Sequence, residues 1–245
     1  MNAPVLLDLA RRAAWPLPVA TRLDVFERLP SHYLHPSRCA GPGVPGMPTA
    51  LASFGTAGMA IWHRYRSRAL RAAQPSLARA LPAALPADLV RVMLLDPAAL
   101  ARLARAGGVV LLAPGIGATI ARDAVALLRR ALGESLYQFA LHTAATHHPG
   151  MAVGREGGGE ANATRLVARV DPLGWSLIDA ALGTADPSVR ARVALKRAFT
   201  GVDGQAPAAT SLAPPLLTAR EALTLTDSLL SHFEPAWFSS FNAIR

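Results

Sequence analysis

The segment 107–142 constrains the fold of this chain more than any other part, because it is compatible with only two architectures. It runs from an apolar stretch at 109–113, through a Gly-x-Gly turn at Gly115 and Gly117, into a helical pattern. As strand, loop and helix, this order is typical of the phosphate-binding loop of a nucleotide-dependent enzyme. As three consecutive helices, it is the centre of an all-α protein.

The residues of this segment favour the helical interpretation. A dinucleotide-binding loop needs a third glycine where this chain has Ile120, and no Gly-Lys-Ser/Thr phosphate loop occurs anywhere. Gly133 is expected to end a helix, and a new apolar face that includes Phe139 starts beyond it. Before Gly133, apolar residues recur at the three-to-four spacing of one helix face: Ile116, Ile120, Ala124, Leu127, Leu128, Ala131 and Leu132.

The remaining residues also predict helices. The chain is 51% hydrophobic but only 6% aromatic, and no segment alternates apolar and polar residues as a half-buried strand would. Asp96 and Thr218 are placed to cap helices, the second in a capping box with Glu221. Besides the central segment, the predicted helices are 5–14, 19–29, 49–74, 87–95, 97–106, 162–182 with a break at 171–172, 187–199 and 217–233.

We therefore expect one irregular all-α domain over residues 1–245. Stretches rich in glycine and proline predict flexible loops at 36–48, 149–161 and 200–215. The aromatic tail at 236–241 is expected to dock on the core.

The charge of the chain is strongly positive, with a formal net charge of +9, and every basic side chain except Lys196 is an arginine. Such a balance suits nucleic acid, an acidic protein partner or a membrane surface, although arginines scattered in ones and twos can equally be a solvated surface. The candidates for an interaction surface are the arginines of two predicted helices: Arg64, Arg66, Arg68, Arg71, Arg122, Arg129 and Arg130.

Catalytic and metal-binding patterns are weak. Cys39 is the only cysteine, which excludes an intrachain disulfide and any multi-cysteine metal site. His142, His147 and His148 lie close together in the sequence, but no acidic residue follows them at helical spacing, so a solvated helix end explains them better than a metal does. No nucleophile elbow or paired carboxylates occur either. We expect a binding protein without enzymatic activity, cofactor or small-molecule substrate.

The location of the protein is expected to be cytoplasmic. No uninterrupted apolar run approaches the roughly 18 residues of a membrane-spanning helix. The first residues also lack the basic start of a secretory signal.

Two motifs give the chain a resemblance to a known family. Residues 29–38 run Leu-Pro-Ser-His-Tyr-Leu-His-Pro-Ser-Arg and contain a Tyr-x-His-Pro turn at Tyr33, His35 and Pro36. The central segment contains a Gly-x-x-Leu-Leu run, an Ile-Ala-Arg and then a Leu-Gly-x-x-Leu-x-x-Phe-Ala-Leu that includes Gly133 and Phe139. In both places the chain resembles the SctK/YscK family, accessory proteins of the type III secretion sorting platform.

The resemblance implies an all-helical adaptor at the cytoplasmic face of the inner membrane. It would link the cytoplasmic domain of the inner-membrane ring protein SctD to the pod protein SctQ. The chain departs from the family by carrying Pro114 in the central block and a glycine-rich insertion at 154–159. Two other functions stay open from the residues themselves: a helical nucleic-acid-binding regulator that uses the arginines, and a nucleotide-dependent enzyme built on Gly115 and Gly117.

Overall fold

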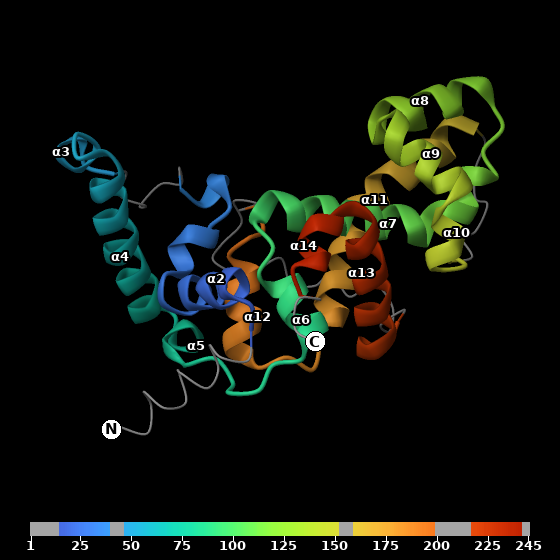
Figure 1. Cartoon of the computed structure of the whole chain (residues 1–245). Helices are drawn as coiled ribbons and strands as arrows, with labels where there is room; N and C mark the ends of the chain where they lie inside the picture. The colour runs from blue at the N-terminus through green and yellow to red at the C-terminus, as the bar shows by residue number, and fades with distance from the viewer. Residues whose placement is uncertain (1–14, 40–46, 152–158, 199–216, 242–245) are drawn as a thin grey trace. The chain divides into compact units, whose positions relative to one another are not determined.

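The computed structural model describes residues 15–39, 47–151, 159–198 and 217–241 (Figure 1). Within these ranges every regular element is a helix and there is no strand, which confirms the all-α prediction. The residues group into two compact units, which are described separately. Unit 1 comprises Met1–Leu100, Thr184–Leu212 and Ala236–Arg245, and unit 2 comprises Ala101–Gly183 and Ala213–Pro235.

Prolines begin most helices of unit 1. A proline at the first helical position suits the helix because its fixed φ is already helical and its missing N–H has no intrahelical partner there. Prolines start η1, η2, α5, α12 and α14 in this way. The elements are α2 (Leu17–Arg28), η1 (Pro30–Tyr33), η2 (Pro36–Arg38), α3 (Thr49–Ala52), α4 (Gly55–Ala73), α5 (Pro75–Ala78), α6 (Ala87–Met93), α12 (Pro187–Ala194) and α14 (Pro235–Ser239).

Two buried cations from the end of α12 and the turn after it hold unit 1 together. Arg192 is 2% exposed and donates hydrogen bonds to the backbone carbonyls of Ser188, Glu27, Leu77 and Arg79, so it joins α12 to α2 and α5. Such bonds to a charged donor are stronger than neutral ones. The guanidinium thereby satisfies backbone groups that the short helices of this unit leave open.

Lys196 is the second buried cation and is fully enclosed. Its ammonium donates to the carbonyls of Met93, at 2.6 Å, and Leu95, which lie at the C-terminal end of α6. A cation is favoured there because the helix dipole is negative at that end. The ammonium also lies over the rings of Phe26 and Tyr33, 5.0 and 4.4 Å from their centroids. Burial lowers the pKa of Lys196 well below its usual value.

Unit 2 is built on two long helices, α7 (Pro97–Gly117), which begins in unit 1, and α11 (Gly159–Ala181) (Figure 1). Its other helices are α8 (Arg122–Leu132), α9 (Glu134–His142), α10 (Ala144–His147) and α13 (Ala219–Phe233). Both predicted caps are confirmed: the Asp96 carboxylate accepts from the N–H of Ala99, and Thr218 forms the capping box with Glu221. Gly133 ends α8 with φ of +82°, a conformation that glycine adopts at little cost.

The helices α7 and α11 cross at two glycines without side chains between them. A Cβ added to Gly108 would lie 1.9 Å from the carbonyl oxygen of Val170, and one added to Gly174 would lie 1.8 Å from that of Ala104. Both distances are far inside van der Waals contact, so only glycine fits at either position. The two backbones therefore touch at the centre of unit 2.

Two prolines lie inside helices, and at one of them, Pro172, the sequence predicts a break. Pro114 lies within α7, and the N–H of Met151 donates to the carbonyl of Leu111, at 2.8 Å, one turn before it. Pro172 lies within α11, so the predicted break at 171–172 is wrong. Because α11 packs against both α8 and α13 along its length, tertiary contacts outweigh the roughly 3 kcal/mol that an interior proline costs.

Several other predicted boundaries differ from the structure. The predicted helix 49–74 is interrupted after Ala52 by the turn that leads to Gly55, whose φ is +54°, and the helix expected at 187–199 ends at Ala194. The loop 36–48 contains η2, and the loop 149–161 ends earlier because α11 begins at Gly159. Residues 5–14 and 200–215 lie outside the described residues.

Ile120 corrects the helix face predicted for the central segment. It lies between α7 and α8 and is 91% exposed, whereas Ile116, Ala124, Leu128 and Leu132 are buried as expected. The face is interrupted because α7 ends at Gly117 and α8 begins only at Arg122. The tail is confirmed as a docked element of unit 1: Phe241 is buried and the Trp237 indole N–H donates to the carbonyl of Arg91, at 2.9 Å.

Candidate functional site

The helix α4 of unit 1 leaves most of its surface exposed. Only Gly58, Trp62 and Ser67 are buried among its 19 residues. A Cβ on Gly58 would lie 1.8 Å from the carbonyl oxygen of Leu51, so α3 packs directly on the N-terminal half of α4 (Figure 1). A soluble helix normally turns its polar side outward, and large exposed apolar side chains are the informative exception.

Four large side chains share the exposed side of α4. Ile61 and Tyr65 are 50% and 58% exposed and stand one turn apart, and Arg64 and Arg68 are exposed at the same spacing. At 100° per residue the four lie within one stripe of the helix surface. We call Ile61, Arg64, Tyr65 and Arg68 the α4 outer face. Phe54, which is 67% exposed, adds an apolar side chain where α3 meets α4.

The structure divides the four arginines predicted on this helix into two pairs. Arg66 donates to the carbonyl of Arg38, at 3.4 Å, and lies over the Trp62 ring, while Arg71 donates to the carbonyl of Ser67. Within the part of the chain that the structure describes, Arg64 and Arg68 make no hydrogen bond or ion pair. The α4 outer face therefore presents two unpaired cations to solvent.

The opposite side of α4 is attached to η1 by a buried polar cluster. The Ser67 hydroxyl donates to that of Ser31, at 2.8 Å, and the Ser31 hydroxyl contacts the carbonyl oxygen and Nδ1 of His63, at 2.9 and 3.0 Å. His63 also stacks on His32, with ring centroids 3.7 Å apart. Burial lowers the pKa of His63, and His32 and Arg66 lower it further. Burial likewise lowers the pKa of His32, so this attachment disfavours the charged form of both imidazoles.

This cluster was not predicted from the sequence. Ser31 and Ser67 lie on different elements, and nothing in their local pattern indicates that they meet. A serine beside a histidine is also the start of a catalytic dyad. Here the Ser31 side chain is only 4% exposed and its hydroxyl is already bonded to His63 and Ser67, so the cluster is a structural joint.

The predicted family motif lies next to this joint. Tyr33 is buried, packs edge-on against Phe26 and donates from its hydroxyl to the carbonyl of Arg22, at 3.3 Å; burial raises its pKa to about 12. His35 caps η2 by accepting from the N–H of Ser37, at 3.2 Å, and Pro36 is the first residue of η2. Tyr33 thus anchors η1, which carries α4's attachment, and His35 and Pro36 start the next short helix, η2.

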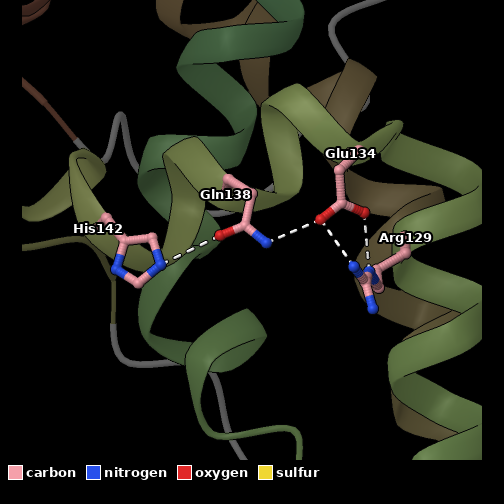
Figure 2. A network of polar contacts seen from close by, with 4 residues as sticks. All are labelled: Arg129, Glu134, Gln138 and His142. Carbon is pink, nitrogen blue, oxygen red and sulfur yellow. Dashed lines mark hydrogen bonds and ion pairs between the residues drawn. The ribbon is translucent and has the colours of Figure 1, made fainter.

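The second predicted arginine group lies on α8 of unit 2, where all three members are exposed. Arg129 makes a bidentate ion pair with Glu134, at 2.7 and 2.8 Å, and Gln138 links the same carboxylate to His142 (Figure 2). The hydrogen bonds from Arg129 and Gln138 lower the pKa of Glu134 to about 2. Arg129 is therefore occupied within its own unit, whereas Arg122 and Arg130 make no such bond among the described residues.

The remaining motif residues of unit 2 are structural. Gly133 joins α8 to α9, and Phe139 is buried against Phe233, His147 and His232, with the closest centroid at 4.9 Å. His147 bonds the Ser228 hydroxyl at 2.7 Å. Burial lowers the pKa of His147 and His232 lowers it further.

In the described ranges there is neither a phosphate-binding loop at Gly115 and Gly117 nor a cluster of metal ligands. Gly115 and Gly117 form the last turn of α7, so the residues expected to make a phosphate loop are helical. No group of three or more histidine, cysteine or acidic side chains is close enough there to hold a metal ion. Cys39 is exposed, with its thiol free.

One described helix, α7, is long and apolar enough to cross a membrane by length and composition alone. Of the most apolar 18 residues of α7, 72% are buried inside the protein, and the core helix of a soluble protein can have the same length and composition. The contact between Gly108 and Val170 places α7 in the core of unit 2.

Comparison of the chain with known protein families, with curated proteins and with solved structures finds no match. Its function is inferred from its own residues. Of the seven large hydrophobic side chains that are exposed in the described ranges, α4 carries three: Met59, Ile61 and Tyr65. Exposed apolar side chains of this kind are typical of surfaces that bind another macromolecule.

Proposed function

We propose that this chain is a non-enzymatic adaptor of a type III secretion machine, which links the cytoplasmic domain of SctD to SctQ. The observation that carries the proposal is the α4 outer face, where exposed apolar side chains stand beside unpaired arginines. Apolar side chains supply binding energy at the centre of an interface, and cations orient an acidic partner.

The resemblance to the SctK/YscK family supports the choice of machine. Tyr33 ends η1, His35 caps η2 and Pro36 begins it, while the central motif runs from α7 through α8 and Gly133 into α9. An all-helical adaptor of this kind acts at the cytoplasmic face of the inner membrane through its protein partners. It needs no cofactor and converts no substrate.

The test is reconstitution of the full chain with SctD and SctQ from the same gene cluster. The chain is mixed with the purified SctD cytoplasmic domain and with SctQ, separately and together, and the mixtures are resolved by size-exclusion chromatography. We expect both binary complexes and a ternary complex that forms only when the chain is present. Failure of the chain to bind either protein would refute the proposal.

The same preparation separates the adaptor from a nucleic-acid-binding regulator. Binding of duplex DNA that weakens steeply with salt would indicate phosphate contacts by the arginines. If the chain binds duplex DNA tightly at physiological salt and binds neither protein, the regulator is the better account.

A further inference from the structure

We infer that the α4 outer face binds an acidic amphipathic helix of a partner protein. This inference rests on the proposed function, since it names the kind of partner that an adaptor would hold, and it concerns one element of unit 1. The occupant follows from the charge, the spacing and the composition of the face.

The charged side chains of α3, α4 and α5 are all positive. Between Glu27 and Asp88 the sequence contains no acidic residue, so α3, α4 and α5 carry no carboxylate. Arg64 and Arg68 have no partner among the described residues, and Arg66 and Arg71 add charge on the flanks. Cations without intramolecular partners are best neutralised by carboxylates from outside, which also steer the approach of the partner.

The spacing of the face is that of one helix packing on another. The side chains at Ala57, Ile61, Arg64, Arg68 and Ala72 form an exposed row at intervals of three and four residues. The small alanines at both ends allow close approach, and the row is about 22 Å long at 1.5 Å per residue. A second helix presents side chains at the same intervals, so about four of its turns match the row.

The composition of the face decides between a protein helix and other occupants. A second copy of this chain would bring the same arginines against each other, which costs energy. A membrane surface would bury only Ile61, Tyr65 and Phe54 of this face, which is a small apolar area for a helix that lies in a membrane interface. A phosphate backbone would neutralise them but would leave Ile61 and Phe54 without apolar contact. An acidic amphipathic helix satisfies both kinds of side chain.

The experiment compares variants of the full chain with matched changes of charge. The paired substitution Arg64→Glu with Arg68→Glu alters the α4 outer face, and Arg122→Glu with Arg130→Glu makes the same change of charge at exposed arginines of α8. The probes are a fluorescent synthetic peptide of leucine and glutamate in a helical amphipathic repeat, the SctD cytoplasmic domain and SctQ. Binding is measured by fluorescence anisotropy and calorimetry.

The expected result is a loss confined to the α4 pair. Its affinity for the peptide and for one of the two proteins falls about tenfold or more, because charge reversal replaces attraction with repulsion, while the α8 pair changes little. Ile61→Asp weakens binding as well, and Ile120→Asp, which introduces the same charge at another exposed isoleucine, does not. All substituted side chains are exposed, so thermal unfolding midpoints should match that of the unmodified chain.

Several outcomes would overturn the inference. It fails if the unmodified chain does not bind the peptide, or if the α4 pair binds all probes as the unmodified chain does. It also fails if the unmodified chain self-associates, or binds duplex DNA or phosphatidylglycerol vesicles more tightly than the peptide, and the α4 pair of substitutions abolishes that binding. If SctD and SctQ bind regardless of α4, the adaptor stands without this face. If the peptide binds through α4 but neither SctD nor SctQ binds the chain, the inference about the α4 outer face is supported and the proposed role in type III secretion is refuted.

Discussion

Replacing Gly108 with alanine tests the contact between α7 and α11 directly. The added Cβ would lie 1.9 Å from the carbonyl oxygen of Val170, and an ordinary carbon–oxygen contact is about 3.3 Å, so the helices must separate by about 1.4 Å. A backbone carbonyl cannot rotate away as a side chain can. We therefore expect a cost near the upper end of the overpacking range, about 3 kcal/mol, which exceeds the roughly 1 kcal/mol that alanine gains in helix propensity.

The assay is thermal and urea unfolding followed by circular dichroism at the helical signal. For a chain of this size, a loss of about 3 kcal/mol lowers the Tm by about 6–12 °C. The matched control is Gly117→Ala in the same helix, where the nearest atom to the new Cβ, on Leu141, is 4.0 Å away. This variant should be as stable as the unmodified chain or slightly more so. Equal stability of both variants would refute the close crossing.

Three further predictions concern His63 in the polar cluster between α4 and η1, the capping box of α13 and the ion pair between Arg129 and Glu134. The folded state lowers the pKa of His63 from its ordinary 6.5, so the free energy of unfolding should be constant above pH 6.5 and fall below it. In urea titrations at several pH values, His63→Gln should reduce this fall. A fall that the substitution leaves unchanged would contradict the prediction. Thr218→Ala should cost about 1 kcal/mol in thermal unfolding, whereas Thr218→Ser should cost little. Arg129→Ala should raise the pKa of Glu134 from about 2 toward 4.5 in carboxyl NMR titrations, and a carboxylate that still titrates near 2 would show that the pair is not its cause.

Local signals predicted most of the helices correctly. Proline and capping residues act within one turn, so Asp96, Thr218 and Gly133 could be assigned their roles from neighbouring residues alone. The misplaced boundaries depend on distant contacts. Pro172 was expected to break α11. The helix stays continuous because α8 and α13, which are distant from Pro172 in the sequence, pack against α11.

The candidate site was predictable only in part. The run of arginines on one predicted helix was visible in the sequence, but its periodicity could not tell which side would pack against the protein. That side is chosen by Ser31 and His32 of η1, which bind Ser67 and His63. This choice leaves Arg64 and Arg68 in solvent and turns Ile61 and Tyr65 outward with them.

The burial of Lys196 has a practical consequence for experiments on complexes of this protein. It is the single lysine of the chain and its ammonium is enclosed by carbonyls and aromatic rings, so amine-reactive crosslinkers meet no accessible lysine on the folded protein. Crosslinks from its side chains are therefore better formed through carboxylates, through Cys39 or through photoreactive groups. Acylation of Lys196, followed by mass spectrometry, would in turn report each opening of unit 1.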